Sequence, residues 1–450
     1  MNAAPGGGAA RRHLSWRAVV PLSGAVRWPR RAAIVLAGVT GALTGLAVTG
    51  FEQVTREALF GHLRDLPRPV QAAAPMVGLL VAAVALRWLG RRASPSTADE
   101  YIRNFHEPGP LALQPVPARV LASVSTLGLG GAMGYEGPSI YMGAAIGRAV
   151  HARTRNLLAG EDTKVLLVAG AAAGVAAIFK APLTGVVFAL EVPYRDDFAR
   201  HMLVPASVAA AASYLVFVAF TGTAPLFAVG GSPPFDLRDL GGAALLGVLC
   251  GLCARVFAVA LVGAKRLSAR IDPWARAIGA GLLLGGLATL SFALFGAGLT
   301  LGAGYDNLVW AFDPRRALGL VVALFVMRAL ATLCTVGGGG AGGLFIPLVI
   351  EGALLGRAVS GLFRTARNGT HFFPLIGVAA FLGAGYRVPL AGVVFAAEAS
   401  GRPGFVVPGV IATVVAELFM GHASASAYQR ADAPGRAGTG TADEGRHSDG

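Results

Sequence analysis

Two stretches of this sequence align without a gap: Gly134-Tyr-Glu-Gly-Pro-Ser-Ile-Tyr-Met-Gly-Ala-Ala-Ile-Gly-Arg-Ala-Val150 and Gly343-Leu-Phe-Ile-Pro-Leu-Val-Ile-Glu-Gly-Ala-Leu-Leu-Gly-Arg-Ala-Val359. A second pair follows in the same order: Lys180-Ala-Pro-Leu-Thr-Gly-Val-Val-Phe-Ala-Leu-Glu191 and Arg387-Val-Pro-Leu-Ala-Gly-Val-Val-Phe-Ala-Ala-Glu398. The offsets are 209 residues (343 minus 134) and 207 residues (387 minus 180). Matching blocks in one order at nearly one offset predict a chain with two duplicated halves.

The composition predicts that these halves lie in a membrane. Of the 450 residues, 54% are hydrophobic and 14% are charged, whereas an ordinary soluble domain has roughly 25% charged residues. Several apolar blocks approach the roughly 20 residues that span a bilayer, namely Ala32–Phe51, Ala73–Leu89, Leu203–Phe220, Gly241–Val262 and Ala275–Leu294. The sequence therefore excludes a soluble globule and a single-anchor protein, and predicts an all-α polytopic membrane protein.

Polar ends flank the predicted membrane domain at 31–428. Residues 1–30 are expected to form a basic tail on the cytoplasmic side, where Arg-rich ends are retained. Residues 429–450 are expected to form a disordered polar tail. The domain divides into a first half at about 31–222 and a second at about 240–428. We expect a multi-pass protein of the cell (inner) membrane with both termini cytoplasmic. The net charge of +14 gathers in tails and connections, which does not indicate a nucleic-acid partner.

Each copy of the first block is predicted to break a helix and restart it inside the membrane. A Gly-rich run ends at Gly134 or Gly343, and Pro138 or Pro347 follows four residues later, where proline suits the first turn of a helix. The free N–H groups and the positive dipole end of such a helix attract anions. Duplicated halves with broken helices are typical of secondary transporters. Close helix packing alone would explain the glycines, but not the repeated proline.

Glu136 is the strongest functional candidate. It lies two residues before Pro138, so its carboxylate can occupy the anion site itself and leave that site on protonation. Carboxylates inside a membrane are costly and usually functional. The repeat mate of Glu136 is Phe345, so the repeat does not require a charge there. A structural salt bridge is the alternative.

A second helix restart is predicted in each half, at Pro182 and Pro389. Glu191 and Glu398 follow these prolines at the same spacing. Because both halves carry this carboxylate, we expect a shared structural role, such as capping or interhelical bonding, in preference to proton transfer by Glu191.

These motifs resemble those of the CLC family of chloride channels and proton-coupled anion exchangers. Gly134-Tyr-Glu-Gly137-Pro138 is similar to the family's G[K/R]EGP motif, and Gly343-Leu-Phe-Ile-Pro347 is similar to its GxFxP motif. The resemblance covers residues 30 to 428 and is strongest to prokaryotic members without cytoplasmic regulatory domains. It implies an inverted-repeat bundle of many tilted and broken helices, usually a homodimer with one anion path in each subunit.

The resemblance assigns residues to the anion path. Glu136 resembles the gating glutamate, and the central anion site corresponds to the backbone of Gly343, Leu344, Phe345 and Ile346.

Tyr428 is the nearest match to the tyrosine whose hydroxyl closes the central site. An ungapped register from Gly421 instead places Ala425 there, with Ser424 and Ser426 as competing hydroxyls.

The sequence departs from the family in three places. Ser94-Pro-Ser-Thr-Ala-Asp-Glu-Tyr-Ile102 stands in place of the GSGIP motif, and alignment puts Thr97, with Ser96 beside it, at the serine that contacts the anion. Val192 stands where exchangers commonly carry the inner proton-transfer glutamate. Tyr135 replaces a basic residue, which should weaken the positive potential at the outer mouth.

Two mechanisms stay open for the transport of chloride or a related inorganic anion. In an exchanger, Glu136 carries protons alternately with anions, whereas in a channel the path stays open once Glu136 swings away. Val192 favours the channel, because a crossing proton needs a relay. The likeness to prokaryotic members, many of which are exchangers, favours exchange.

A polytopic membrane enzyme is a distant alternative. The eight histidines form no His-x-x-x-His or His-Glu-x-x-His pattern, and no Gly-x-Ser-x-Gly element occurs, so we expect no enzyme activity. Cys250 and Cys253 have no further metal ligands nearby, so we expect neither a metal nor a cofactor.

Overall fold

The computed structural model describes residues 31–158, 164–195, 197–227, 236–313, 315–363 and 371–431. The predicted basic tail at 1–30 and residues 432–450 of the predicted polar tail lie outside this part of the chain. The described residues form helices and isolated bridges. Seven helical segments among them are long and apolar enough to cross a membrane. The prediction of an all-α polytopic membrane protein is therefore confirmed.

The first half runs from Arg31 to Thr221. Its helices are α1 (Arg31–Glu52), α2 (His62–Asp65), α3 (Arg68–Val84), α4 (Ala98–His106), α5 (Val116–Gly128), α6 (Glu136–Arg153), α7 (Val165–Phe179), α8 (Pro182–Glu191) and α9 (Leu203–Thr221). Shorter turns extend or precede these helices, namely the π-helices η1 (Gln53–Gly61) and η2 (Ala85–Leu89) and the 3-10 turn η3 (Arg200–Met202).

The second half runs from Leu237 to Met420. Its helices are α10 (Leu237–Ser268), α11 (Pro273–Phe295), α12 (Tyr305–Phe312), α13 (Leu318–Gly337), α14 (Phe345–Ser360), α15 (Phe372–Tyr386), α16 (Pro389–Ser400) and α17 (Val406–Met420), with the 3-10 turn η4 (Pro403–Phe405) before α17.

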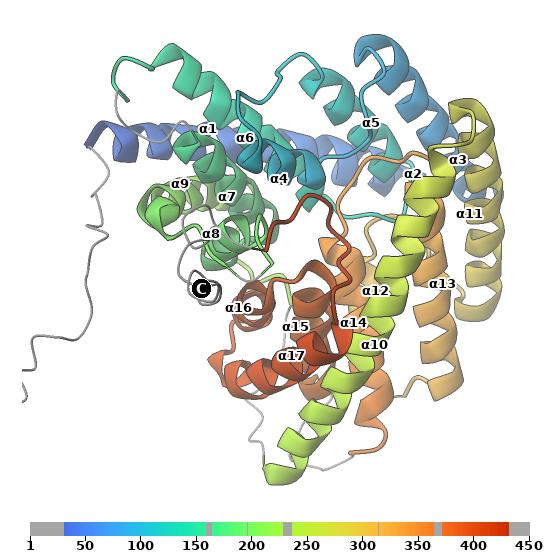
Figure 1. Ribbon diagram of the computed structural model, residues 1–450. Coiled ribbons are helices and arrows are strands. Elements are labelled where there is room, and N and C mark those ends of the chain that lie inside the picture. The colour runs from blue at the N-terminus through green and yellow to red at the C-terminus, as the bar shows by residue number, and fades with distance from the viewer. Residues whose placement is uncertain are drawn as a thin grey trace, which may run out of the picture.

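The helix order of the second half repeats that of the first. The equivalent pairs are α1 with α10, α3 with α11, α4 with α12, α5 with α13, α6 with α14, α7 with α15, α8 with α16 and α9 with α17. The packing repeats too, because α1 packs on α9 as α10 packs on α17, and α6 packs on α7 as α14 packs on α15. Figure 1 shows the blue-to-green half beside the yellow-to-red half, and α3 contacts α11 where they meet. The predicted duplication is confirmed.

Two equivalent glycines pair with each other at the centre of the molecule. Gly134 N donates to Gly343 O, and Gly343 N donates to Gly134 O, both at 2.8 Å. The two residues form an antiparallel bridge. Antiparallel pairing of a residue with its own repeat mate places a two-fold axis between them. The halves are therefore related as an inverted repeat, and α6 and α14 begin on either side of the axis.

The centre of each half is a short buried helix. Every residue of α7 and of α15 is buried, and each has 15 residues, so each is about 22 Å long and shorter than the ~30 Å hydrocarbon core. The residues after them, Lys180 and Arg387, are both left-handed, at φ 52° and 55°. Pro182 and Pro389 then begin α8 and α16. Each predicted restart is thus a helix start in the structure.

The end of the described chain differs from the expected boundary at residue 428. Gln429 is buried, and its side-chain amide donates to Val192 O at 3.0 Å and to Tyr386 O at 2.9 Å. Arg430 pairs with Tyr194 in a parallel bridge. These contacts satisfy carbonyls at the ends of α8 and α15, so the packed domain continues to residue 430. Polar composition alone did not indicate this.

Candidate functional site

Glu136 is the first residue of α6, and its side chain reaches across the two-fold axis to the start of α14. Its Oε1 accepts from the Phe345 amide at 2.5 Å, and the amides of Ile346 and of Glu136 itself also act on the carboxylate. Oε2 has no hydrogen-bond partner among the described residues. The side chain is fully buried. One carboxylate therefore fills the electropositive space where two helix N-termini converge.

The glycines of the two repeated motifs leave room for this carboxylate. A methyl group added at Gly343 would lie 2.0 Å from Glu136 Oε1, and one added at Gly134 would lie 1.9 Å from Oε2. Both distances are far shorter than any non-bonded contact between heavy atoms. The repeated glycine is therefore a steric requirement for a group the size of a carboxylate between α6 and α14.

Aromatic side chains fix the backbone that faces Glu136. The ring of Phe345 lies 4.5 Å from Phe179, 4.7 Å from Phe395 and 5.3 Å from Phe188, between ring centroids. These rings are all buried. Because they pack around the first residue of α14, the amide of Phe345 is held in place and is shielded from water.

The next amide of this helix start contacts a tyrosine that the sequence analysis did not select. Leu344 N donates to the hydroxyl of Tyr386 at 3.3 Å. Tyr386 is the last residue of α15 and is buried, and its ring packs edge-on against Phe188 at 5.6 Å. The hydroxyl of Tyr386 and the carboxylate of Glu136 thus contact neighbouring amides of one helix start.

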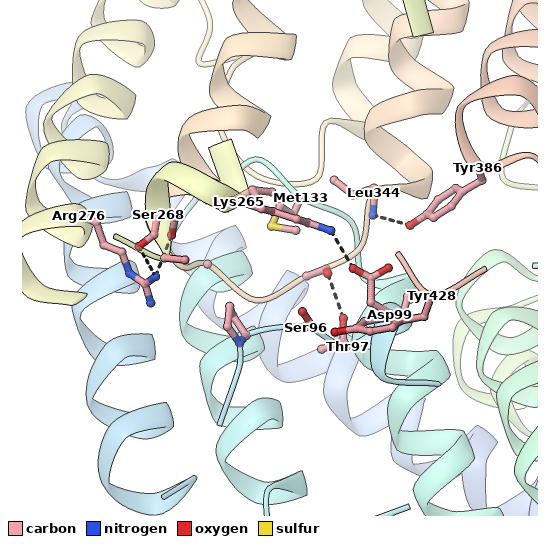
Figure 2. A pocket seen from close by; sticks show the side chains of 16 residues that line it. Ser96, Thr97, Asp99, Met133, Lys265, Ser268, Arg276, Leu344, Tyr386 and Tyr428 are labelled. Carbon is pink, nitrogen blue, oxygen red and sulfur yellow. Dashed lines mark hydrogen bonds and ion pairs between the residues drawn. The ribbon is translucent and has the colours of Figure 1, made fainter. Parts of the chain in front are cut away.

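A cavity of about 420 Å³ opens on one side of this site, and we call it the Thr97 cavity (Figure 2). It is lined by Pro95, Ser96, Thr97, Ala98, Asp99, Met133, Lys265, Ser268, Ala269, Arg276, Val336, Gly340, Gly342, Leu344, Tyr386 and Tyr428. It therefore brings together the predicted Ser96, Thr97, Leu344 and Tyr428.

Thr97 lies immediately before α4 and is buried. Its hydroxyl donates to Gly342 O at 3.0 Å, and a methyl group at Gly137 would lie 2.5 Å from this oxygen. The hydroxyl thus lies close to the starts of both α6 and α14. Its proton is used within the protein, so it must turn away from Gly342 before it can donate to an anion.

Tyr428 lies at the wall of the Thr97 cavity, and its contact with an anion stays a prediction. It lines the Thr97 cavity, is 55% exposed and has a left-handed backbone at φ 65°. Of the competing hydroxyls, Ser424 donates to Gln429 Oε1 and Ser426 donates to Asp99 Oδ1. Tyr386 is the residue whose hydroxyl meets the Leu344 amide.

A second cavity, of about 220 Å³, is lined by Tyr135, the residue before Glu136, and we call it the Tyr135 cavity. The ring of Tyr135 is buried and stacks on Tyr305, with centroids 6.2 Å apart. Arg56 and Arg64 line this cavity, and the guanidinium of Arg56 lies 5.1 Å from the ring centre of Tyr305. Cations from the α1–α2 region are therefore present where the motif lacks its basic residue.

Glu191 and Glu398 cap each other's helices across the two-fold axis. Glu191 accepts from Leu390 N at 3.0 Å and Ala391 N at 2.8 Å, at the start of α16. Glu398 accepts from Leu183 N at 3.0 Å and from Thr184 N and Oγ1, both at 2.7 Å, at the start of α8. These bonds satisfy amides that would otherwise lack partners, which fits the structural role expected of the pair.

Val192 directly follows α8 and is buried. Its side chain has no titratable group, and its carbonyl accepts from Gln429 Nε2. Within the described residues, no three His, Cys, Asp or Glu side chains come together as metal ligands would.

An inverted-repeat bundle in which broken helices from both halves meet at the centre is typical of membrane transport proteins. Residues 77–421 match the family described as "Voltage gated chloride channel". The chain therefore belongs to the CLC family of membrane transporters, whose members are not enzymes.

Individual relatives agree with this assignment. The "H(+)/Cl(-) exchange transporter ClcA" of Yersinia pestis bv. Antiqua (strain Angola) is 28% identical over 417 residues, which cover 86% of this chain and 85% of that protein. A solved slow cyanobacterial Cl-/H+ antiporter superposes with a TM-score of 0.77 at 22% identity, covering 87% of this chain and 95% of that one. A solved CLC-type fluoride/proton antiporter has a TM-score of 0.77 at 23% identity, with coverage of 89% and 98%. The predicted family and inverted-repeat fold are confirmed.

Proposed function

We propose that this protein exchanges a small inorganic anion, with chloride as the first candidate, for protons, and that Glu136 is the gate. The observation that carries the proposal is the position of the Glu136 carboxylate. It is bound to the Phe345 amide and is fully buried. Tyr135, the residue before Glu136, lines the Tyr135 cavity, and Leu344, the residue before Phe345, lines the Thr97 cavity.

The chemistry of exchange follows from competition for the same amides. An ionised Glu136 excludes an anion, because two negative charges cannot share the N–H groups at Phe345 and Ile346. Protonation removes the charge of Glu136 and weakens its bond to Phe345 N, since hydrogen bonds to ionised groups are the stronger kind. The neutral side chain then leaves, and an anion takes its place. Each anion movement is thereby linked to a proton on Glu136.

The choice of anion is part of the proposal. Relatives include exchangers of chloride and of fluoride with protons, and the motif at Gly343–Pro347 resembles the family's GxFxP motif. We take the anion donors to be the backbone at Gly343, Leu344, Phe345 and Ile346, with the hydroxyl of Thr97 as a further donor and Ser96 and Tyr428 at the cavity wall.

A passive anion channel is the second candidate, favoured by one observation. Val192 places an apolar side chain where exchangers commonly carry the inner proton-transfer glutamate. If no other group carries the proton on that side, Glu136 could only gate anion flow.

Reversal potentials separate these candidates. The purified protein is reconstituted in a bilayer under a chloride gradient with a pH gradient imposed. An exchanger gives a potential that moves with the pH gradient, and chloride drives protons uphill. A potential fixed at the chloride equilibrium value refutes exchange and supports the channel. Repeating the measurement with fluoride and nitrate assigns the anion.

The family resemblance also supports a homodimer, and the Arg-rich N-terminal end supports termini in the cytoplasm. In that orientation the Thr97 cavity faces the cytoplasm and the Tyr135 cavity faces outward. Single-molecule subunit counting in liposomes tests the dimer, and protease accessibility of the N-terminal tail tests the orientation.

A further inference from the structure

The Thr97 cavity contains a carboxylate that the proposed function does not yet use. Asp99 is the only acidic residue among the described residues that line the cavity. It lies in the first turn of α4, two residues after Thr97, and its side chain is 13% exposed. The Thr97 cavity therefore contains a titratable group, although Val192, which stands where exchangers commonly carry the inner glutamate, has none.

Two other parts of the chain, α10 and the segment after α17, supply polar partners to Asp99. Lys265 Nζ on α10 lies 2.8 Å from Oδ2, and Oδ1 accepts from Ala427 N at 2.9 Å and from Ser426 Oγ at 3.2 Å. Figure 2 shows the pair formed by Asp99 and Lys265 across the cavity. Arg276 on α11 lines the same cavity, but its guanidinium donates to Ser268. Asp99 thus joins α4, α10 and the C-terminal segment.

Tyr386 belongs both to the helix start that holds Glu136 and to the wall of the Thr97 cavity. Its hydroxyl contacts the Leu344 amide, next to the Phe345 amide that holds Glu136. Asp99 and Tyr386 line the same cavity, and its volume of about 420 Å³ has room for on the order of ten water molecules.

We propose that Asp99 and Tyr386 carry the proton between the Thr97 cavity and Glu136, in place of the carboxylate absent at Val192. A proton from the cavity binds Asp99 and makes it a neutral acid. Asp99 then donates this proton, directly or through cavity water, to the hydroxyl oxygen of Tyr386, which releases its own proton toward Glu136. At the end Asp99 is ionised again, Tyr386 is unchanged and Glu136 is neutral.

The proposal rests on proton-coupled exchange and names the residues that supply its inner step. Its alternative is that Asp99 only holds Lys265 and the C-terminal segment in place. A variant of Lys265 separates the two, because Lys265→Met breaks the same ion pair and keeps the carboxylate. Asp99→Glu keeps a carboxylate with a longer side chain.

The experiment measures protons moved per chloride in proteoliposomes under a chloride gradient, for the wild type, Asp99→Asn, Asp99→Glu and Lys265→Met. Because a positioned proton carrier typically contributes about 10²-fold or more, Asp99→Asn is expected to lower proton movement per chloride about tenfold or more. Lys265→Met keeps a ratio close to that of the wild type, and Asp99→Glu retains part of the coupling. Size-exclusion chromatography and chloride flux show that each variant is folded.

Tyr386→Phe provides a second test if Asp99→Asn does not fold. It removes one oxygen and keeps the ring against Phe188, and its proton-to-chloride ratio is also expected to fall.

The outcomes are distinguishable. A wild-type ratio in Asp99→Asn, or in Tyr386→Phe, overturns the proposed relay while exchange stands. Equal uncoupling by Lys265→Met and Asp99→Asn also overturns it, in favour of a structural ion pair. No uphill proton movement in the wild type overturns both the relay and the exchange.

Discussion

Removing the Glu136 side chain should make the central site bind chloride more tightly. In the structure the Glu136 carboxylate accepts one charge-assisted hydrogen bond of 2.5 Å from the Phe345 amide. A hydrogen bond to a charged group has a net value of about 1.5–3 kcal/mol, and an anion must displace it in order to bind. Since about 1.4 kcal/mol is a factor of ten in an equilibrium constant, Glu136→Ala should strengthen chloride binding by about tenfold to about 150-fold.

Isothermal titration calorimetry with the purified protein at neutral pH measures this change. The wild type should bind chloride more tightly as the pH falls, because protonation removes the competing charge of Glu136. Glu136→Ala should bind tightly at every pH. Glu107→Gln, which alters a carboxylate that is 54% exposed, is the matched control and should behave like the wild type. Wild-type affinity in Glu136→Ala, or an unchanged pH dependence, would refute the competition.

Three further predictions concern the groups around this site. Gly343→Ala should abolish the pH dependence of flux and cost about 1–3 kcal/mol of stability, because its methyl group displaces the Glu136 carboxylate. The control Gly241→Ala adds a methyl group that meets no atom within 4 Å and should be neutral in thermal unfolding and in flux assays. Glu398→Ala should lower stability by about 0.5–2 kcal/mol through its lost caps and leave the proton-to-chloride ratio intact, and a changed ratio would contradict a structural role. Arg56→Gln should slow anion uptake from the Tyr135 cavity at low salt and not at high salt, and a deficit independent of salt would exclude steering.

The repeat in the sequence predicted much of the architecture, because small residues and prolines at fixed spacing specify where helices stop and restart. The alignment of Gly134 with Gly343 identified equivalent residues, and both lie at the centre of the molecule. The sequence could not show from the residues alone that these glycines pair with each other, since a repeat offset carries no information on relative orientation. The capping by Glu191 and Glu398 followed from the same symmetry and could be anticipated.

The residues that line the Thr97 cavity were harder to predict. Lys265 is 166 residues from Asp99 in the sequence, and no local pattern brings the two together. Tyr386 carries one weak signal, since its repeat mate is Phe179 and an extra hydroxyl at a buried position needs a partner. The register at Tyr428 could not be predicted because α17 ends at Met420, and the irregular chain beyond it has no periodicity to count from.

The central claim is that the starts of α6 and α14 form one anion site, which the Glu136 carboxylate fills. Anomalous diffraction from crystals grown in bromide tests this claim most directly. In Glu136→Gln the account predicts a bromide peak within hydrogen-bond distance of the Phe345 and Ile346 amides, and in the wild type at high pH it predicts no peak at that position. A bromide bound elsewhere in Glu136→Gln would contradict the account. A bromide bound at these amides in the wild type, beside an unmoved Glu136 carboxylate, would also contradict it.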